Sequence, residues 1–193
     1  MPIKIFIDQG HNPGGINGGA EGNGLVEQEI TYNVGIYLNN LLNNDYRFES
    51  MVSRENIDTI LGTNNTTSLQ TRVNMANTWG ADYFISIHTN ASESESLNGS
   101  EVYVYSQQSP AYEMAEDILD NIVELVGTRD NNVRINRALY VLRKTTMPAL
   151  LVELAYITNP QDAEKLANDQ YLFAYAIYRG ILEYFDFEPL ENN

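Results

Sequence analysis

Residues 3–15, IKIFIDQGHNPGG, carry a short apolar run that leads almost directly to a histidine in a glycine-rich loop. The run Ile3–Ile7 has the length and the β-branched composition of a buried strand. Asp8 closes the run, and a loop rich in Gly and Asn extends from Gly10 to Gly24. The segment therefore predicts a strand of a buried sheet, with His11 just past its carboxyl end.

The same arrangement recurs at two other places in the chain. The run Tyr83–Ile87 is followed by His88, and the run Ala149–Val152 ends on Glu153. His11 and His88 are the only histidines of the chain, and each of them follows a predicted strand. Three separate segments thus bring a metal-binding or proton-binding side chain to the end of a strand.

Helical patterns separate these strands. Apolar residues recur every three or four positions, and Asn, Pro and Gly mark several helix ends. Strands that alternate with helices favour an α/β fold of the phosphorylase/hydrolase-like kind, a mostly parallel twisted sheet with helices on both faces of a single domain. The predicted helices begin near Glu27, near Thr67 or Ser68, at Pro110, at Asn159–Pro160 and near Gln170, and further short strands are expected at Met51–Val52, Glu101–Tyr105 and Leu139–Leu142.

The composition limits the function. The 193 residues are 43% hydrophobic and 19% charged, which suits one packed domain. The net charge of −15 opposes binding to nucleic acid, and no apolar run is long enough to insert into a membrane. The absence of cysteine excludes disulfides and thiolate ligands. We expect a monomer.

The strand ends indicate a metal site. Carboxyl ends of parallel strands meet at one edge of a sheet, so His11, His88 and Glu153 should converge there. Two imidazoles and a carboxylate make a catalytic zinc set that leaves one position for water, and a further glutamate can carry the proton. Glu27 is one candidate for the ligating carboxylate, and Glu29 and Glu21 are alternatives.

The sequence indicates less specific roles for the other polar residues. Arg54 and Arg72 favour structural roles, tying loops or helix ends together. Asn90, close to His88, either orients the loop or touches the substrate. A serine hydrolase is disfavoured, because no histidine is placed to act as a base for a serine.

At these residues the chain resembles the zinc-dependent N-acetylmuramoyl-L-alanine amidases of the Amidase_3 family, which are bacterial and phage cell-wall hydrolases. The segments that carry the resemblance are IDQGHNPGGINGGAEGNGLVEQ, SREN with LQTRVNMAN, ADYFISIHTNAS and MPALLVELAYITNPQDAEKL. The resemblance implies that His11, Glu27 and His88 bind Zn²⁺ and that Glu153 is the catalytic acid/base. It implies a peptidoglycan or muropeptide substrate, cut between N-acetylmuramic acid and L-alanine of the stem peptide.

The resemblance also implies an organisation of the chain. It assigns residues 1–187 to the zinc amidase catalytic domain and leaves 188–193 as a frayed tail. Asn12-Pro13 stands where the family usually has Gly-Gly, so the loop beside the metal should differ. The segment from Thr89 to Gly99 is too short and too polar for the inserted blocking helix of regulated members, which predicts an open site.

Two other functions are compatible with the sequence. A zinc carboxypeptidase or other metallo-amidohydrolase on a related scaffold would need a cation for a terminal carboxylate, and Arg134, Arg137 and Arg143 are candidates. The second rival is a non-catalytic cell-wall-binding module, although such a module would not need an acid/base such as Glu153.

The expected site of action is the cell wall or another extracellular location, and no secretory leader opens the sequence. We therefore expect release by lysis or a leader that lies outside this sequence.

Overall fold

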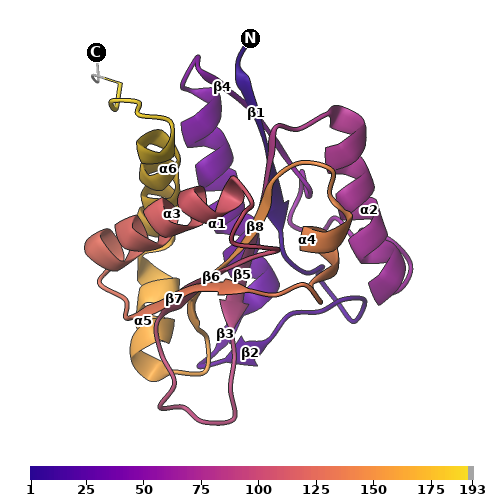
Figure 1. The fold of residues 1–193 in the computed structure, drawn as a ribbon. Helices are drawn as coiled ribbons and strands as arrows, with labels where there is room; N and C mark the ends of the chain where they lie inside the picture. Colours follow the sequence, from indigo (N-terminus) through magenta and orange to yellow (C-terminus); the bar gives the residue numbers. More distant parts are fainter. Residues whose placement is uncertain (191–193) are drawn as a thin grey trace.

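The central sheet of the computed structural model, which describes residues 1–190, has six strands in the order β4-β1-β5-β8-β6-β7 (Figure 1). The first four run parallel, β6 pairs antiparallel with β8, and β7 runs parallel to β6. The predicted α/β fold with a mostly parallel sheet is confirmed. The strands are β1 (Ile3–Gln9), β4 (Phe48–Val52), β5 (Tyr83–Asn90), β6 (Ser100–Val104), β7 (Asp130–Ile135) and β8 (Ala149–Tyr156), and a separate small sheet pairs β2 (Glu21–Gly22) with β3 (Leu25–Val26).

Helices cover both faces of the sheet, as predicted. One face carries α1 (Glu27–Asn43), α3 (Ala111–Val126) and α6 (Gln170–Tyr184), and the other carries α2 (Asn65–Trp79) and α4 (Tyr140–Lys144) (Figure 1). The remaining helix, α5 (Pro160–Asn168), packs against β8 and α6. No helix among residues 1–190 has the length and hydropathy to cross a membrane.

The alternation of side chains along the strands divides the core into two parts. Ile5 and Ile7 face the larger core beneath α1, α3 and α6, whereas Phe6 faces the smaller core beneath α2 and α4. Phe6 stacks there on Phe84 of β5, with ring centroids 5.6 Å apart. Because both faces of the sheet are buried, its strands are continuous apolar runs, which is why they could be recognised in the sequence.

The predicted strand at Leu139–Leu142 is wrong, because α4 (Tyr140–Lys144) occupies that segment. Val141 and Leu142 are buried in the smaller core, while Arg143 and Lys144 point to solvent. So short an apolar run fits a helical turn as well as a strand, and its period alone cannot separate the two.

The structure also differs from the prediction at the start of one helix and in strands that the sequence did not indicate. Helix α2 begins at Asn65, where Asn64 and Thr67 form a capping box, slightly earlier than predicted. The polar strand β7 and the β2–β3 pair were not predicted from the sequence. Of the predicted frayed tail, residues 191–193 lie outside the described part of the chain, and Glu188 accepts a hydrogen bond at its carbonyl oxygen from Arg47 (2.9 Å).

Candidate functional site

Three side chains of the types that ligate metal ions meet at the carboxyl edge of the parallel strands. His11 follows β1, Glu27 opens α1, and His88 lies near the end of β5. Their candidate ligand atoms all lie within 4.8 Å of one another, and this is the one such group found among residues 1–190. The structure thus brings together the three residues that the sequence indicated as ligands.

The spacing of the three ligand atoms fits a small tetrahedral ion. His88 Nδ1 lies 3.1 Å from His11 Nε2 and 3.2 Å from Glu27 Oε1, and His11 Nε2 lies 3.3 Å from Glu27 Oε2. Zinc bound at its usual distances of 2.0–2.1 Å holds neighbouring ligand atoms about 3.3 Å apart. Two imidazoles and a carboxylate are also a donor set that zinc prefers.

The orientation of His11 is fixed through its other ring nitrogen and its backbone. Nδ1 of His11 lies 3.1 Å from the carbonyl oxygen of Asn17, to which it donates when Nε2 is the ligand. His11 has a φ of 67°, a left-handed conformation that a non-glycine residue adopts at a cost. Arg72 stabilises it by donating from Nη2 to the His11 carbonyl oxygen (2.5 Å).

Glu27 is buried and oriented by two backbone amides. Its Oε2 accepts from Ala20 N and its Oε1 accepts from Thr89 N, both at 2.8 Å. Burial alone would raise the pKa of Glu27, but hydrogen bonds and charge from His11 and His88 outweigh burial and hold the pKa below its usual range. The carboxylate is therefore ionised, as a ligand must be.

The alternative carboxylates, Glu21 and Glu29, are exposed and lie outside the group of ligand atoms. Both line a glycine-rich groove of about 670 Å³, whose lining includes neither histidine. The geometry therefore favours Glu27 over either of them. The groove is lined by Gly14, Gly15, Asn17, Gly18, Gly19, Glu21, Val26, Gln28, Glu29 and Asn65.

Two glycines allow the close approach of the ligands. A Cβ atom on Gly10 would lie 2.5 Å from the His88 ring, and one on Gly19 would lie 2.7 Å from Cβ of Glu27. Gly10 also accepts a hydrogen bond from Thr31 Oγ1 (2.7 Å) at its carbonyl oxygen. The space occupied by His88 and Glu27 thus depends on residues without side chains at these two positions.

Glu153 lies on β8 directly opposite His88 of β5. Its Oε2 atom is buried and has no hydrogen-bond partner among the described residues. Burial raises the pKa of Glu153 well above its usual range, and the nearby charges of Glu27 and Glu101 raise it further. A carboxyl group without a partner, beside three ligand atoms, is well placed to exchange a proton at this site.

A second group of polar residues adjoins Glu153 and was not recognised in the sequence. Glu101 of β6 lies directly opposite Glu153, is 2% exposed, and accepts hydrogen bonds from Asn90 Nδ2 (2.5 Å) and Tyr103 Oη (3.0 Å). Arg134 of β7 completes the group, with Nε 2.7 Å from Glu101 Oε2. Asn90 is thus held by Glu101, close to His88 in the chain. The sequence signal for this group was weak, because nothing local showed that β6 reverses direction.

The loop departs from the usual family pattern at Asn12, and this residue has a clear structural role. Its Nδ2 donates to the carbonyl oxygen of Leu61 (3.0 Å), and its Oδ1 accepts from Arg72 Nη2 (2.9 Å). Arg72 also pairs with Asp8, at 2.6 Å between Nη1 and Oδ1. Arg54 is likewise fully buried, donating to Gln28 O at 2.6 Å. These buried contacts agree with the structural roles expected for both arginines.

The segment between β5 and β6 forms no helix. Ser92 N donates to Thr158 Oγ1 (3.0 Å), and Asn159 Nδ2 donates to the carbonyl oxygen of Glu95 (2.7 Å), so the loop is anchored beside the start of α5.

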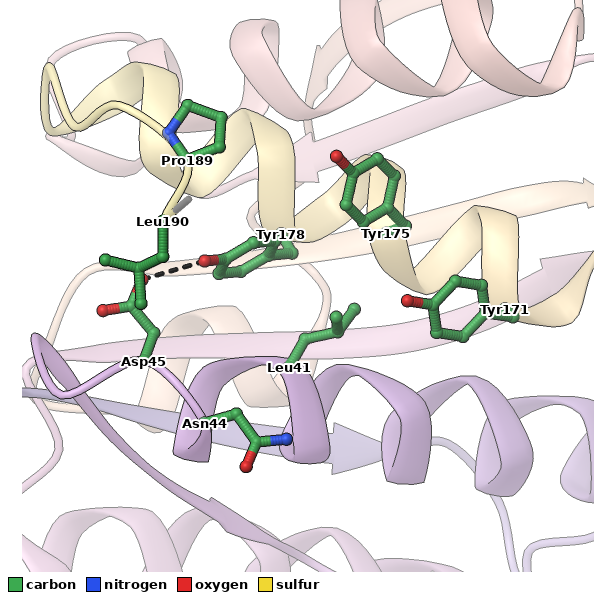
Figure 2. Close-up of a pocket in the computed structure, with 8 residues that line it drawn as sticks. All are labelled: Leu41, Asn44, Asp45, Tyr171, Tyr175, Tyr178, Pro189 and Leu190. Carbon is green, nitrogen blue, oxygen red and sulfur yellow. Dashed lines mark hydrogen bonds between the residues drawn. The ribbon is translucent and has the colours of Figure 1, made fainter. Parts of the chain in front are cut away.

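A separate pocket of about 360 Å³ lies between α1, α6 and the last described residues (Figure 2). Tyr178 donates there to Asp45 Oδ2 (2.8 Å), and Asp45 also pairs with Arg47. The lining of this pocket includes none of His11, Glu27, His88 and Glu153. The lining consists of Leu41, Asn44, Asp45, Tyr171, Tyr175, Tyr178, Pro189 and Leu190.

A parallel-sheet α/β scaffold with a His-Glu-His cluster at its carboxyl edge defines a class of candidate metallohydrolases. Residues 5–183 match the model of the Amidase_3 family, N-acetylmuramoyl-L-alanine amidase, and the chain belongs to this family. It is 40% identical over 179 residues to the N-acetylmuramoyl-L-alanine amidase CwlM of Bacillus licheniformis, covering 92% of this chain and 65% of that protein. It is 41% identical over 185 residues to LytC of Bacillus subtilis (strain 168), also an N-acetylmuramoyl-L-alanine amidase, covering 94% and 35%.

A solved structure agrees with the fold. The N-acetylmuramoyl-L-alanine amidase from Clostridium difficile 630 superposes with a TM-score of 0.85 at 29% identity, covering 97% of this chain and 99% of that one. The chain spans less than two thirds of the length of the two curated relatives above.

Proposed function

We propose that this chain is the catalytic part of a zinc-dependent N-acetylmuramoyl-L-alanine amidase. It would hydrolyse the amide between the lactyl group of N-acetylmuramic acid and L-alanine of the stem peptide in peptidoglycan. The observation that carries the proposal is the position of Glu153. Its buried Oε2 atom has no hydrogen-bond partner among residues 1–190, and it lies on the strand next to His88. His88 forms, with His11 and Glu27, a cluster whose spacing suits zinc. Membership of the Amidase_3 family supports the choice of substrate.

The residues that would hold zinc are His11 through Nε2, His88 through Nδ1 and Glu27 through its carboxylate. Zinc bound there would supply Lewis-acid chemistry, polarising the scissile carbonyl and lowering the pKa of water. The chain prepares the ligands in advance: Asn17 fixes the tautomer of His11, and the amides of Ala20 and Thr89 hold Glu27.

Glu153 performs the proton transfers. It accepts a proton from the attacking water as the new C–O bond forms at the lactyl carbonyl carbon. It then gives this proton to the departing alanine nitrogen as the C–N bond breaks. Its raised pKa, caused first by burial, suits a group that must hold the proton between the two steps.

The proposal places the activity in residues 1–187, and it places the site of action in the cell wall. Glu153 and the three proposed ligands all lie within the span matched by the family.

Digestion of purified wall sacculi, followed by mass spectrometry, tests the reaction. New amino ends on L-alanine are expected. Released C-terminal amino acids would indicate a carboxypeptidase instead, and sedimentation with the sacculi without cleavage would indicate a binding module.

The metal is tested separately. Elemental analysis should find one zinc ion per chain, lost together with activity after treatment with a chelator and restored by added Zn²⁺. His11→Ala and His88→Ala should each strip the metal. Full zinc occupancy in both variants would place the metal elsewhere.

A further inference from the structure

The group formed by Glu101, Tyr103 and Arg134 extends the site beyond Glu153 toward the edge of the sheet. Strand order places β6 next to β8 and β7 next to β6, and neighbouring strands lie about 4.8 Å apart. Cross-strand partners in an antiparallel pair share a face, so Glu101 and Glu153 point to the same side. Because Arg134 contacts Glu101, its guanidinium lies about one to two strand spacings from Glu153.

The contacts of Arg134 leave one edge of its guanidinium available. Nε lies 2.7 Å from Glu101 Oε2 and donates to the carbonyl oxygen of Asn131 (3.1 Å). Within residues 1–190, Nη1 and Nη2 have no hydrogen-bond partner, and the side chain is 53% exposed. These two nitrogens form the edge that binds a carboxylate through two parallel hydrogen bonds.

Glu101 holds this arrangement in place. It is buried, and Asn90 and Tyr103 bind its Oε1 while Arg134 pairs with Oε2. The buried carboxylate fixes Nε of Arg134, so only the opposite edge remains for a ligand. A cation held in this way is a recognition group rather than a flexible surface charge.

We propose that Arg134 binds a carboxylate of the stem peptide and so determines on which side of Glu153 the peptide lies. The inference rests on the proposed amidase function. The lactyl carboxyl is consumed in the amide that is cut, so the carboxylates of the substrate belong to its peptide part. An extended peptide advances about 3.4 Å per residue, which brings the residue after L-alanine under Arg134. A chain with a net charge of −15 needs such a local contact to hold an anionic peptide.

The test compares two soluble muramyl peptides that differ at one group. In one, the carboxylate of the second peptide residue is free, and in the other it is a carboxamide. The zinc-loaded wild type should have the lower KM for the carboxylate form. Arg134→Gln should raise that KM at least about tenfold, leave kcat nearly unchanged and leave the KM of the carboxamide form unchanged, since the two charge-assisted hydrogen bonds together contribute at least about a factor of ten.

Two further variants separate recognition from folding and from general charge. Arg129→Gln removes the same charge from an exposed position just before β7 and should behave as the wild type. Arg134→Lys keeps the charge and should retain part of the preference. Equal effects of Arg134→Gln on both substrates, or no effect on either, would overturn the inference while leaving the amidase function intact. A wild type that cleaves neither substrate would overturn the proposed function, and this inference with it.

Discussion

Glu153 combines two properties that an isolated carboxylate does not have. It lies at the end of a buried strand, and its Oε2 has no hydrogen-bond partner among residues 1–190. A buried charge without a partner is costly, so the protonated form is favoured until a reactant shares the proton. A zinc ion held by His11, Glu27 and His88 would favour the ionised form of Glu153, which is the form that accepts the proton of water.

Glu153→Gln should retain zinc and the fold but lose most of the turnover. Glutamine keeps the size of the side chain but cannot accept the proton of water, and loss of a general acid/base typically reduces the rate about 10²- to 10⁴-fold. Activity on a soluble muramyl peptide and zinc content should be measured together. Glu49→Gln on β4, an exposed position, is the matched control. Near-normal turnover in the Glu153 variant would exclude the assigned role.

At the scale of elements, the site depends on how closely the loop after β1 approaches β5. Gly10 N donates to the carbonyl oxygen of Ile87 (3.0 Å), which continues the pairing of the two strands past Gln9. His88 then lies against the Gly10 backbone with no space for a side chain. The strand pairing and the cluster of His11, Glu27 and His88 are therefore coupled through this glycine.

Gly10→Ala should destabilise the domain by about 1–3 kcal/mol, the usual cost of an overpacked core site. Zinc affinity should fall as well, because the new methyl group would displace the His88 ring. Gly15→Ala is the matched control, because a Cβ there meets nothing within 4 Å. Thermal unfolding and zinc titration of both variants would check this. Unchanged zinc affinity in Gly10→Ala would show that His88 is not held as the structure indicates.

The contact between α3 and α6 contains a repulsive group of carboxylates. Burial raises the pKa of Asp117 to about 6, and the charges of Glu183, Asp120, Glu116 and Glu113 contribute. The folded protein thus binds this proton more tightly than the unfolded chain does. As the pH rises from about 4 to about 6, Asp117 ionises in an unfavourable environment, and its contribution lowers the free energy of unfolding.

Asp117→Asn should therefore stabilise the protein above pH 6 and have little effect below pH 4. Asp117 is only partly buried, so screening by solvent reduces the gain to roughly 0.5–1 kcal/mol. Urea unfolding at pH 4 and pH 7.5 measures the difference, with the exposed Asp58→Asn as control. A larger stabilisation at pH 4 than at pH 7.5 would contradict the assigned direction of the pKa shift.

At the scale of the whole molecule, the sequence was informative where buried strands end in polar side chains. His11, His88 and Glu153 follow apolar runs that only a sheet buried on both faces explains, so their convergence could be predicted. Glu101 and Arg134 could not be placed in the same way. Their position depends on the reversal of β6 relative to β8, and β7 is a polar edge strand without an apolar pattern.

The same limit applies to the residues that contact the loop carrying His11. The burial of Asn12 arises from contacts with Leu61 and Arg72, which are about 50 and 60 residues away in the sequence. The local pattern Asn-Pro indicates only a turn. The periodicity and spacing of residues in the sequence do not predict tertiary contacts of this kind.

The loop between β5 and β6 leaves part of the His11 and His88 side chains accessible to solvent. Residues 91–99 form no helix, and the side chains of His11 and His88 are 21% and 19% exposed. The purified, zinc-loaded chain should therefore cleave soluble muramyl peptides without an activating protein. It should be slower on intact walls, because the described fold contains no second module to raise its local concentration there. Rates on both substrates should be compared with and without a lysate of the source cells. Cleavage of the soluble peptide only in the presence of lysate would show that the site needs a partner to become active.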